Sequence, residues 1–320
     1  MAAQRRAATV RMAHGEPDAL DGRGAPFVRH LPGPPGSRTV VLLHGLGGSA
    51  DLTWTPSYPD LARFFSVVAL DLRGHGRGIP HGGGAYRLED CADDVAALVR
   101  TLGVGPVIVV GYSMGGAVAQ LVWRRHPDTV AGLVLCSTAA DFRLPAHERF
   151  MVAAALSTGA FLRTVPPLFR FGFDTASSVL VGHLDDPTRE WARGEFGRCG
   201  FDTAFAAAMA VAEFSSVEWI TALDVPAAVV LTRQDRVVPP SRQRQLAELI
   251  DGAGLYEVDA GHGACLSAVD RFLPPFLAAC EQVARCRPRG PAPAAVDAPG
   301  LVASTRAHGG AANGPINAAQ

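Results

Sequence analysis

Short apolar runs recur along the chain, and most of them end in glycine or in polar residues. Unbroken runs of this length, rich in β-branched residues, are typical of strands that are buried on both faces, as in a parallel sheet. The pattern predicts strands at 39–43 (TVVLL), 66–70 (SVVAL), 106–110 (PVIVV), 130–136 (VAGLVLC), 227–231 (AAVVL) and 255–258.

Between these runs, apolar residues recur at the spacing of a helix. The predicted helices are 88–102, 114–125, 243–250 and 267–286. We expect the last helix to be interrupted near Pro274 and Pro275, because proline removes a helical hydrogen bond. Regular alternation of strand and helix predicts an α/β fold with a mostly parallel, doubly wound sheet.

The alternation divides the chain into a core and an insertion. Residues 25–140 and 220–286 carry the core pattern, whereas 141–219 reads as helices without strand runs and holds ten of the 15 Phe. This composition favours a helical cap that covers a site at the strand ends. Residues 1–24 form an N-terminal segment, and 287–320 is an Ala/Gly/Pro-rich stretch that we expect to be a disordered tail.

The charge of the chain excludes several classes of function. Net charge is −1, and all 29 basic residues are Arg, so Schiff-base chemistry and Walker-A loops are excluded. Weak net charge argues against nucleic-acid or anionic-lipid partners. The six Cys show no CxxC pairing, no metal-binding motif occurs, and no long apolar segment or secretory signal is present. We therefore expect free thiols, no metal, no membrane insertion and a cytoplasmic location.

The candidate nucleophile is Ser113, in the segment Gly111-Tyr112-Ser113-Met114-Gly115. This GxSxG pattern follows a predicted strand directly and opens a predicted helix. A serine on such a sharp turn needs small neighbours, which Gly111 and Gly115 provide. The start of the helix would also offer backbone N–H groups to a developing oxyanion.

A serine nucleophile needs a base, and the base needs a carboxylate that orients it. Asp235 follows the strand at 227–231, and His262 follows the final strand. Residues just beyond the carboxyl ends of parallel strands converge above one edge of the sheet. We therefore predict Asp235 and His262 as the partners of Ser113. Asp224, Asp251 and Asp259 are rival candidates for the acid, and Asp141 is the more serious rival.

A glycine-rich turn, His44-Gly45-Leu46-Gly47-Gly48, follows the first predicted core strand. It would allow the backbone N–H of Leu46 to form an oxyanion hole together with that of Met114. His44 is interpreted as a structural loop residue. The same turn also matches the dinucleotide fingerprint GxGxxA, with Asp71 about 20 residues further on. That alternative leaves the serine, aspartate and histidine at the strand ends unexplained.

Together with the Asp71–Gly76 segment (DLRGHG), these motifs resemble the lidded serine hydrolases of the α/β-hydrolase superfamily. The resemblance covers residues 25–286 and implies a sheet of about eight strands, a helical cap and an acyl-enzyme without a cofactor. The chain departs from the family pattern at three positions. Gly78 stands where a Ser is frequent after the DxRGxG segment, and Thr232 stands where a Gly is frequent before the acid. The Glu that frequently follows the base histidine is missing.

The resemblance favours hydrolysis of a small-molecule ester or lactone with an apolar acyl or ring-bearing group. C–C bond hydrolases, acyltransferases and cofactor-free peroxidases with a serine nucleophile remain alternatives. A ligand-binding protein without turnover and an NAD-dependent oxidoreductase are further interpretations. Because the nucleophile is serine and not aspartate, dehalogenase and epoxide hydrolase activities are disfavoured.

Overall fold

A computed structural model of the chain describes residues 13–15, 20, 22–143 and 185–286. Its eight strands form one sheet in the order β1-β2-β4-β3-β5-β6-β7-β8. The two strands at one edge are antiparallel, and β4, β3, β5, β6, β7 and β8 are parallel. The mostly parallel α/β architecture predicted from the sequence is therefore confirmed. The bounds are β1 Ala13–Gly15, β2 Val28–Leu31, β3 Thr39–Leu43, β4 Ser66–Leu70, β5 Val107–Tyr112, β6 Val130–Cys136, β7 Ala227–Thr232 and β8 Gly254–Val258.

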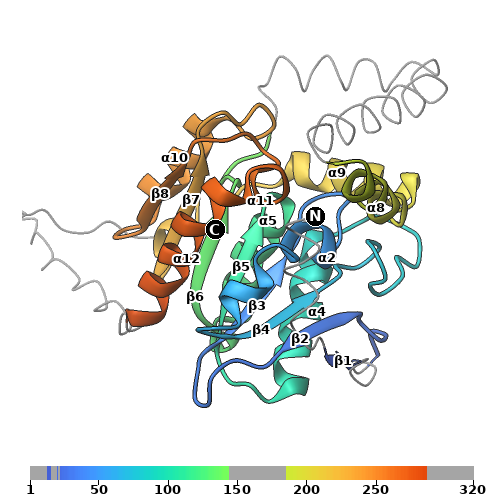
Figure 1. The fold of residues 1–320 in the computed structure, drawn as a ribbon, viewed down its shortest axis with the longest axis horizontal. Helices are drawn as coiled ribbons and strands as arrows, with labels where there is room; N and C mark the ends of the chain where they lie inside the picture. Colours follow the sequence, from blue (N-terminus) through green and yellow to red (C-terminus); the bar gives the residue numbers. More distant parts are fainter. Residues whose placement is uncertain (1–12, 16–19, 21, 144–184, 287–320) are drawn as a thin grey trace, which may run out of the picture. The chain divides into compact units, whose positions relative to one another are not determined.

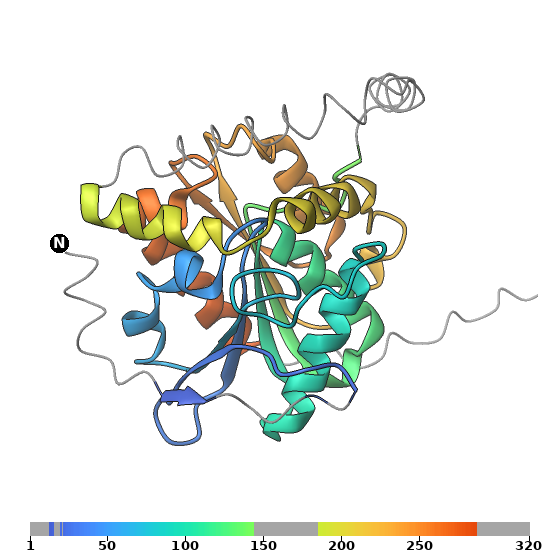
Figure 2. The same ribbon diagram turned by 90° about the vertical axis from the view of Figure 1, so that its right-hand side faces the viewer.

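Helices cover both faces of the sheet (Figures 1 and 2). Alternate residues of each buried strand point to opposite faces. In β3, Val41 and Leu43 belong to the apolar core under α4, α5 and α10, whereas Val40 and Leu42 belong to the core under α2, α3, α11 and α12. The helix bounds are α2 Ala50–Trp54, α3 Tyr58–Leu61, α4 Leu88–Leu102, α5 Met114–Arg125, α8 Asp186–Gly197, α9 Phe201–Glu213, α10 Pro240–Leu249, α11 Ala264–Ser267 and α12 Val269–Arg285.

The final helix differs from the sequence prediction. Helix α12 continues through Pro274 and Pro275, where an interruption was expected. Each proline removes one backbone donor, yet its fixed φ suits a helix. Phe272 and Phe276 on the same helix are fully buried against the sheet. Their burial outweighs the lost hydrogen bonds, so the prediction of an interruption was wrong.

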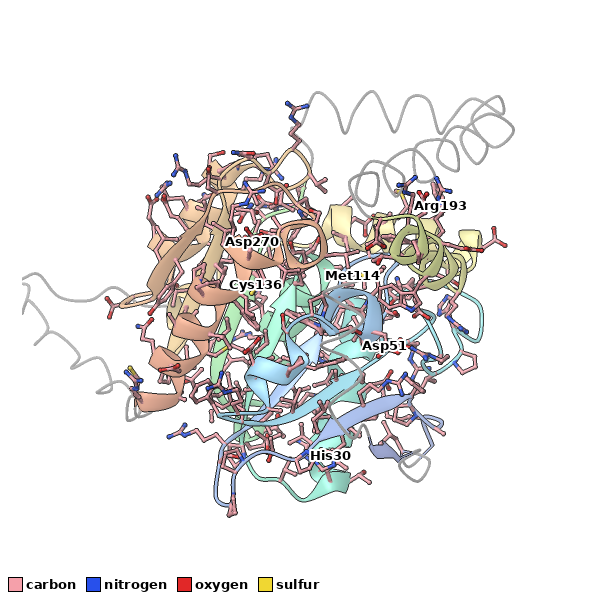
Figure 3. The ribbon with its side chains drawn as sticks, in the orientation of Figure 1. His30, Asp51, Met114, Cys136, Arg193 and Asp270 are labelled. Carbon is pink, nitrogen blue, oxygen red and sulfur yellow. The ribbon has the colours of Figure 1, made fainter. Side chains whose placement is uncertain are left out.

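Between β6 and β7 the chain leaves the sheet. The described part of this insertion contains α8 and α9, which lie across the end of the sheet where the parallel strands finish (Figures 1 and 2). Figure 3 shows Met114 beneath these helices, with Arg193 on the outer side of α8. Residues 144–184 and the expected tail at 287–320 lie outside the described residues.

The sheet order reverses beside β3, since β4 lies on one side of it and β5 on the other. In open α/β sheets, ligands bind at the carboxyl ends of the strands where the order reverses. This point of the fold is where β5 ends in Tyr112 and β3 ends in Leu43. Within the described residues, no helix is long and apolar enough to cross a membrane.

Candidate active site

Ser113 occupies the turn between β5 and α5 in a strained conformation. Its φ is 54° and its ψ is −118°, in a region that residues with a side chain rarely adopt. The turn is possible because glycines surround it. A Cβ on Gly111 would lie 2.2 Å from the carbonyl oxygen of Gly115, and one on Gly115 would lie 2.5 Å from that of Leu43. The GxSxG pattern is therefore required by close backbone packing.

Ser113, His262 and Asp235 lie in a hydrogen-bonded row, although they are far apart in the sequence. The Oγ of Ser113 lies 3.0 Å from Nε2 of His262, and Nδ1 of the same ring lies 2.7 Å from Oδ2 of Asp235. Ser113 is 8% exposed and Asp235 is 5% exposed. The row can carry a proton from the serine to the imidazole while the carboxylate holds the ring.

The Asp235 carboxylate accepts hydrogen bonds at both oxygens. Oδ1 accepts from the backbone N–H groups of Val237 (2.8 Å) and Val238 (2.9 Å). Oδ2 accepts from Thr232 Oγ1 at 2.8 Å and from Gln243 Nε2 at 3.1 Å, in addition to the imidazole. Burial alone would raise the pKa of Asp235, but His262 and these donors outweigh it and lower the pKa below its usual value.

The sequence did not single out Thr232 and Gln243 as partners of the acid. Thr232 was noted only as a departure from a frequent glycine, yet its hydroxyl donates to Asp235. Gln243 lies on α10, eight residues away from the acid. Its complete burial is the signal that could mark it, because a fully buried amide needs partners for both ends.

Asp141, the rival acid, does not contact the imidazole. Its carboxylate pairs with Arg143 at 2.9 Å and 3.0 Å. Arg143 lowers the pKa of Asp141, mainly through that hydrogen bond. The described structure thus brings Asp235 to His262 and leaves Asp141 in a separate ion pair at the base of the insertion.

The glycine-rich turn after β3 lies beside the serine. A Cβ on Gly45 would lie 3.4 Å from the Cβ of Ser113. Leu46 and Met114 line the same cavity as Ser113, where their predicted oxyanion role would place them. His44 is fully buried, accepts from the backbone N–H of Leu72 at 2.9 Å and contacts the carbonyl oxygen of Gly45 at 2.8 Å. Both ring nitrogens of His44 therefore engage backbone, as expected of a structural residue.

The two buried histidines beside this turn are held in the neutral form. Burial lowers the pKa of His44 to about 4. Burial, with a smaller effect of His44, lowers the pKa of His75 to about 3. A neutral His44 that accepts the Leu72 N–H hydrogen bond at Nε2 must carry its proton on Nδ1 and donate it to the carbonyl oxygen of Gly45. The histidine thereby orients the turn that carries the Leu46 N–H group.

Asp71 is not available to a nucleotide ribose, as the dinucleotide interpretation would require. The side chain is fully buried, and it accepts hydrogen bonds from the backbone N–H groups of Ala50 (2.7 Å) and Arg77 (2.8 Å). Burial raises the pKa of Asp71 despite these bonds. The helix after the glycine turn, α2, has only five residues. These features make Asp71 a structural carboxylate.

A cavity of about 260 Å³ opens above Ser113. Apart from Ser113 and His262, its walls are mostly apolar. They come from α2, the insertion, the loops after β7 and β8, and α11, and include Leu52, Phe142, Phe196, Val211, Val238, Cys265 and Leu266. His262 is the one titratable imidazole on this wall, and no carboxylate or guanidinium is among the described lining residues. The cavity therefore suits an uncharged, apolar group.

Helix α8 is joined to the core by a buried ionic network. Glu195, 5% exposed, accepts from Ser49 Oγ at 2.5 Å and from Arg198 at 3.0 Å, and lies 3.5 Å from Arg77. The Ser49 hydroxyl also caps α2 by accepting from the N–H of Leu52. Sequence patterning missed this network, since a lone Glu on a polar helix gives no sign of burial. It fixes the insertion to the segment that follows the glycine-rich turn.

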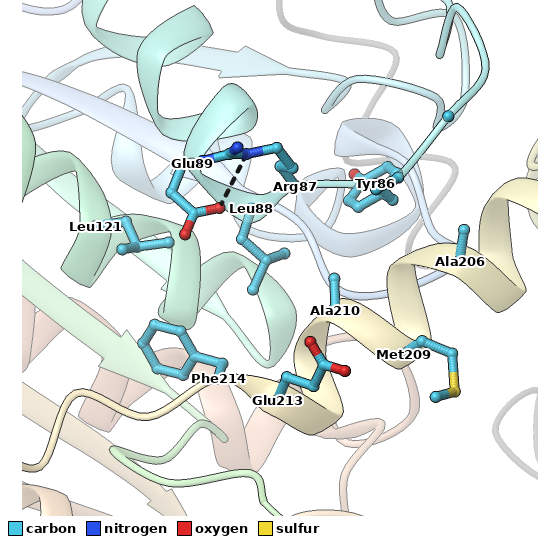
Figure 4. A pocket seen from close by; sticks show the side chains of 12 residues that line it. Tyr86, Arg87, Leu88, Glu89, Leu121, Ala206, Met209, Ala210, Glu213 and Phe214 are labelled. Carbon is cyan, nitrogen blue, oxygen red and sulfur yellow. Dashed lines mark ion pairs between the residues drawn. The ribbon is translucent and has the colours of Figure 1, made fainter.

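A second cavity, of about 600 Å³, lies along α9, and its described lining includes none of Ser113, Asp235 and His262 (Figure 4). Helix α9 contributes Ala206, Met209 and Ala210 to its wall. At the C-terminal end of α9, Phe214 points toward Leu121 of α5, and the Arg87–Glu89 ion pair lies on the far side of Leu121 from Phe214. This cavity is larger than the one above Ser113.

Comparison with known proteins identifies the family. A family profile described as the alpha/beta hydrolase fold matches residues 38–193. The pimeloyl-[acyl-carrier protein] methyl ester esterase of Neisseria meningitidis serogroup A is 30% identical over 250 residues, which cover 75% of this chain and 75% of the esterase. The chain is a member of the α/β-hydrolase family. Another family member, the non-heme chloroperoxidase of Streptomyces lividans, is 30% identical over 264 residues, covering 77% of this chain and 92% of that protein.

Solved structures of α/β hydrolases agree with this assignment. The enol-lactonase of Burkholderia xenovorans LB400 has a TM-score of 0.67 and 25% identity, covering 82% of this chain and 98% of the lactonase. A thermophilic esterase from Thermogutta terrifontis has a TM-score of 0.66 and 25% identity, covering 85% of this chain and 99% of the esterase. The protein is therefore an α/β-hydrolase enzyme whose relatives include esterases and a lactonase.

Proposed function

We propose that this α/β hydrolase is a serine hydrolase that cleaves a carboxylic ester or lactone of an apolar or ring-bearing small molecule. Ser113 is the nucleophile, His262 the base, and Asp235 the residue that orients the base. The observation that carries the proposal is the row of 3.0 Å and 2.7 Å contacts from Ser113 through His262 to Asp235, at the floor of the apolar cavity.

In this mechanism His262 removes the proton of Ser113 while Oγ attacks the acyl carbonyl. Asp235 keeps the Nδ1 proton on the imidazole and stabilises the imidazolium that forms. The backbone N–H groups of Leu46 and Met114 hold the oxyanion, each lowering the barrier by about 3 kcal/mol. His262 then protonates the leaving alcohol, and water attacks the acyl-enzyme by the same sequence of proton transfers.

The substrate preference follows from the cavity. Its described walls carry aliphatic and aromatic side chains and no charged group that would pair with a carboxylate or an ammonium. Desolvating an ion there would lack compensation, so neutral acyl groups are favoured. We further propose that residues 141–219 act as a cap over this cavity, because Phe142, Phe196 and Val211 from that range line it.

The proposal is tested by a substrate panel and by trapping the acyl-enzyme. We expect hydrolysis of p-nitrophenyl butyrate or of a simple lactone, and a mass increase equal to the acyl group on rapid acid quench. Ser113→Ala should remove both signals. Ser267→Ala, which changes an exposed serine on α11 whose hydroxyl donates to the carbonyl oxygen of Gly263, should retain them. Turnover that persists in Ser113→Ala would overturn the proposal.

A second reaction on the same residues is favoured by the similarity to a non-heme chloroperoxidase. Hydrogen peroxide in place of water would attack the acyl-enzyme, releasing a peracid and returning the proton through His262. Peracid formation from an ester and peroxide, measured beside hydrolysis, tests this reaction. Cleavage of a vinylogous diketone in the same panel would instead indicate C–C hydrolysis.

A further inference from the structure

The two cavities have no described lining residue in common, and apolar residues of the same elements form a partition between them. Helix α9 contributes to both: Val211 lines the cavity above Ser113, whereas Ala206, Met209 and Ala210 line the larger one. Helix α5 also contributes to both, with Met114 in the smaller cavity and Leu121 in the larger. Figure 4 shows the side of α9 that faces the larger cavity. Residues of the same two helices thus line two separate cavities.

An aromatic pair belongs to this partition. Phe142 lines the cavity above Ser113, and Phe214 lines the larger cavity. Their ring centroids are 6.2 Å apart in a T-shaped arrangement. The N–H of Phe142 donates to the carbonyl oxygen of Phe214 at 3.1 Å, so the two rings are held where the chain enters and leaves the insertion.

The partition can open without loss of a polar contact by its side chains. Phe142 and Phe214 carry no polar side-chain atoms, and the hydrogen bond between them is made by backbone. Their surroundings, including Leu46, Met114 and Leu121, belong to one apolar cluster. A change of ring rotamer would therefore exchange one apolar contact for another. An acyl chain that passed between the two rings would contact aliphatic and aromatic side chains.

We propose that the larger cavity is a distal acyl subsite, and that the Phe142–Phe214 pair sets how long an acyl chain the enzyme accepts. This inference rests on the proposed acyl-enzyme chemistry at Ser113. The ligand class is a linear, uncharged aliphatic acyl group, whose proximal part fills the 260 Å³ cavity. Its distal part reaches the 600 Å³ cavity only when the rings separate. The polar rim formed by Arg87, Glu89 and Glu213 would then face the end of the chain.

The test compares p-nitrophenyl laurate with p-nitrophenyl butyrate. Phe214→Ala should raise the ratio of kcat/KM for laurate over butyrate by at least about tenfold, since each newly buried methylene contributes about a fourfold gain. Trp219→Phe is the matched control, because Trp219 packs on Phe214 at 6.3 Å but lines neither cavity. The ratio should not change in that control.

A second substitution separates an opened passage from general loosening. Ala210→Phe fills the larger cavity beyond the partition, so in the Phe214→Ala background it should return the ratio to the wild-type value while butyrate hydrolysis persists. Should Phe214→Ala fail to fold, Phe214→Leu removes the ring with less loss of volume. An unchanged ratio in the folded variant, or a raised ratio that Ala210→Phe does not reverse, would overturn the inference.

A binding measurement keeps this test independent of turnover. In the Ser113→Ala background, calorimetry with dodecanol should show tighter binding, by about tenfold, when Phe214→Ala is added. Equal binding in the two variants would refute the distal subsite even if no ester is hydrolysed. Conversely, if no variant hydrolyses an ester but dodecanol binding still tightens, the catalytic proposal fails while the distal subsite is supported.

Discussion

Replacing Asp235 with Asn tests the geometry around the proposed base in the most informative way. Oδ1 of Asp235 accepts from two backbone N–H groups, those of Val237 and Val238, which cannot turn away. The carbonyl oxygen of an Asn must therefore take the Oδ1 position, and its NH₂ group must take the Oδ2 position opposite His262. There the amide donates to Nδ1, so the ring carries its proton on Nε2. That tautomer cannot accept the proton of Ser113.

The expected loss is large. In Ser-His-Asp proteases the corresponding change lowers kcat about 10⁴-fold through the wrong tautomer. The same tautomer reversal here predicts a similar loss, equivalent to about 5 kcal/mol of activation free energy. Thr232 and Gln243 also lose a charged acceptor at Oδ2. The folded protein should persist, because Asn retains the shape of the side chain.

The assay is kcat for p-nitrophenyl butyrate, with circular dichroism to verify the fold. Asp259→Asn is the matched control: it is the same substitution in the loop after β8, at a carboxylate bonded to Gln234 and not to the imidazole. Asp141→Asn tests the rival acid. The reasoning is refuted if Asp235→Asn stays within tenfold of wild type, or if Asp141→Asn is the more damaging change.

Three further predictions concern the packing and the buried charges. Gly115→Ala should lower the free energy of unfolding by about 2 kcal/mol in urea titrations, because the new Cβ meets a β3 carbonyl oxygen at 2.5 Å. Gly194→Ala on α8 is the control: open space surrounds this glycine, so the free energy of unfolding should rise by up to about 1 kcal/mol. Glu195→Ala should cost about 2 kcal/mol by the same measure, since the buried Ser49 hydroxyl and the Arg198 guanidinium lose a charged acceptor, and Glu195→Gln should cost less. Lowering the pH from 7 to 5 should destabilise the protein by about 2 kcal/mol for each of His44 and His75. Their folded pKa values lie below that of an unfolded His, so the unfolded state binds more protons as the pH falls below about 6.5; an unchanged urea midpoint between these pH values would contradict this.

The core strands and the order of the candidate site were predictable from the sequence because their signals are local. Apolar runs such as 130–136 mark strands that are buried on both faces, and β6 has those bounds. Residues that directly follow such strands must gather at one edge of a parallel sheet. Ser113, Asp235 and His262 could therefore be proposed as partners without any knowledge of distances.

The features that the sequence did not reveal depend on contacts between distant segments. Strand β2 was missed because Arg29 interrupts its apolar pattern, yet Arg29 is 8% exposed and pairs with Asp51. A buried ion pair across 22 residues leaves no periodic signal. The continuity of α12 through Pro275 depends on packing against the sheet, which local propensity does not describe. The two short helices α2 and α3 are likewise fixed by burial of Trp54 and Tyr58.

The most direct test of the catalytic assignment is the site of covalent labelling by an alkyl fluorophosphonate. After reaction to completion, intact mass should show one adduct per chain, and peptide mapping should place it on Ser113. Pre-incubation should abolish ester hydrolysis, and Ser113→Ala should remain unlabelled. An adduct on another residue, or full activity in the labelled protein, would contradict Ser113 as the nucleophile.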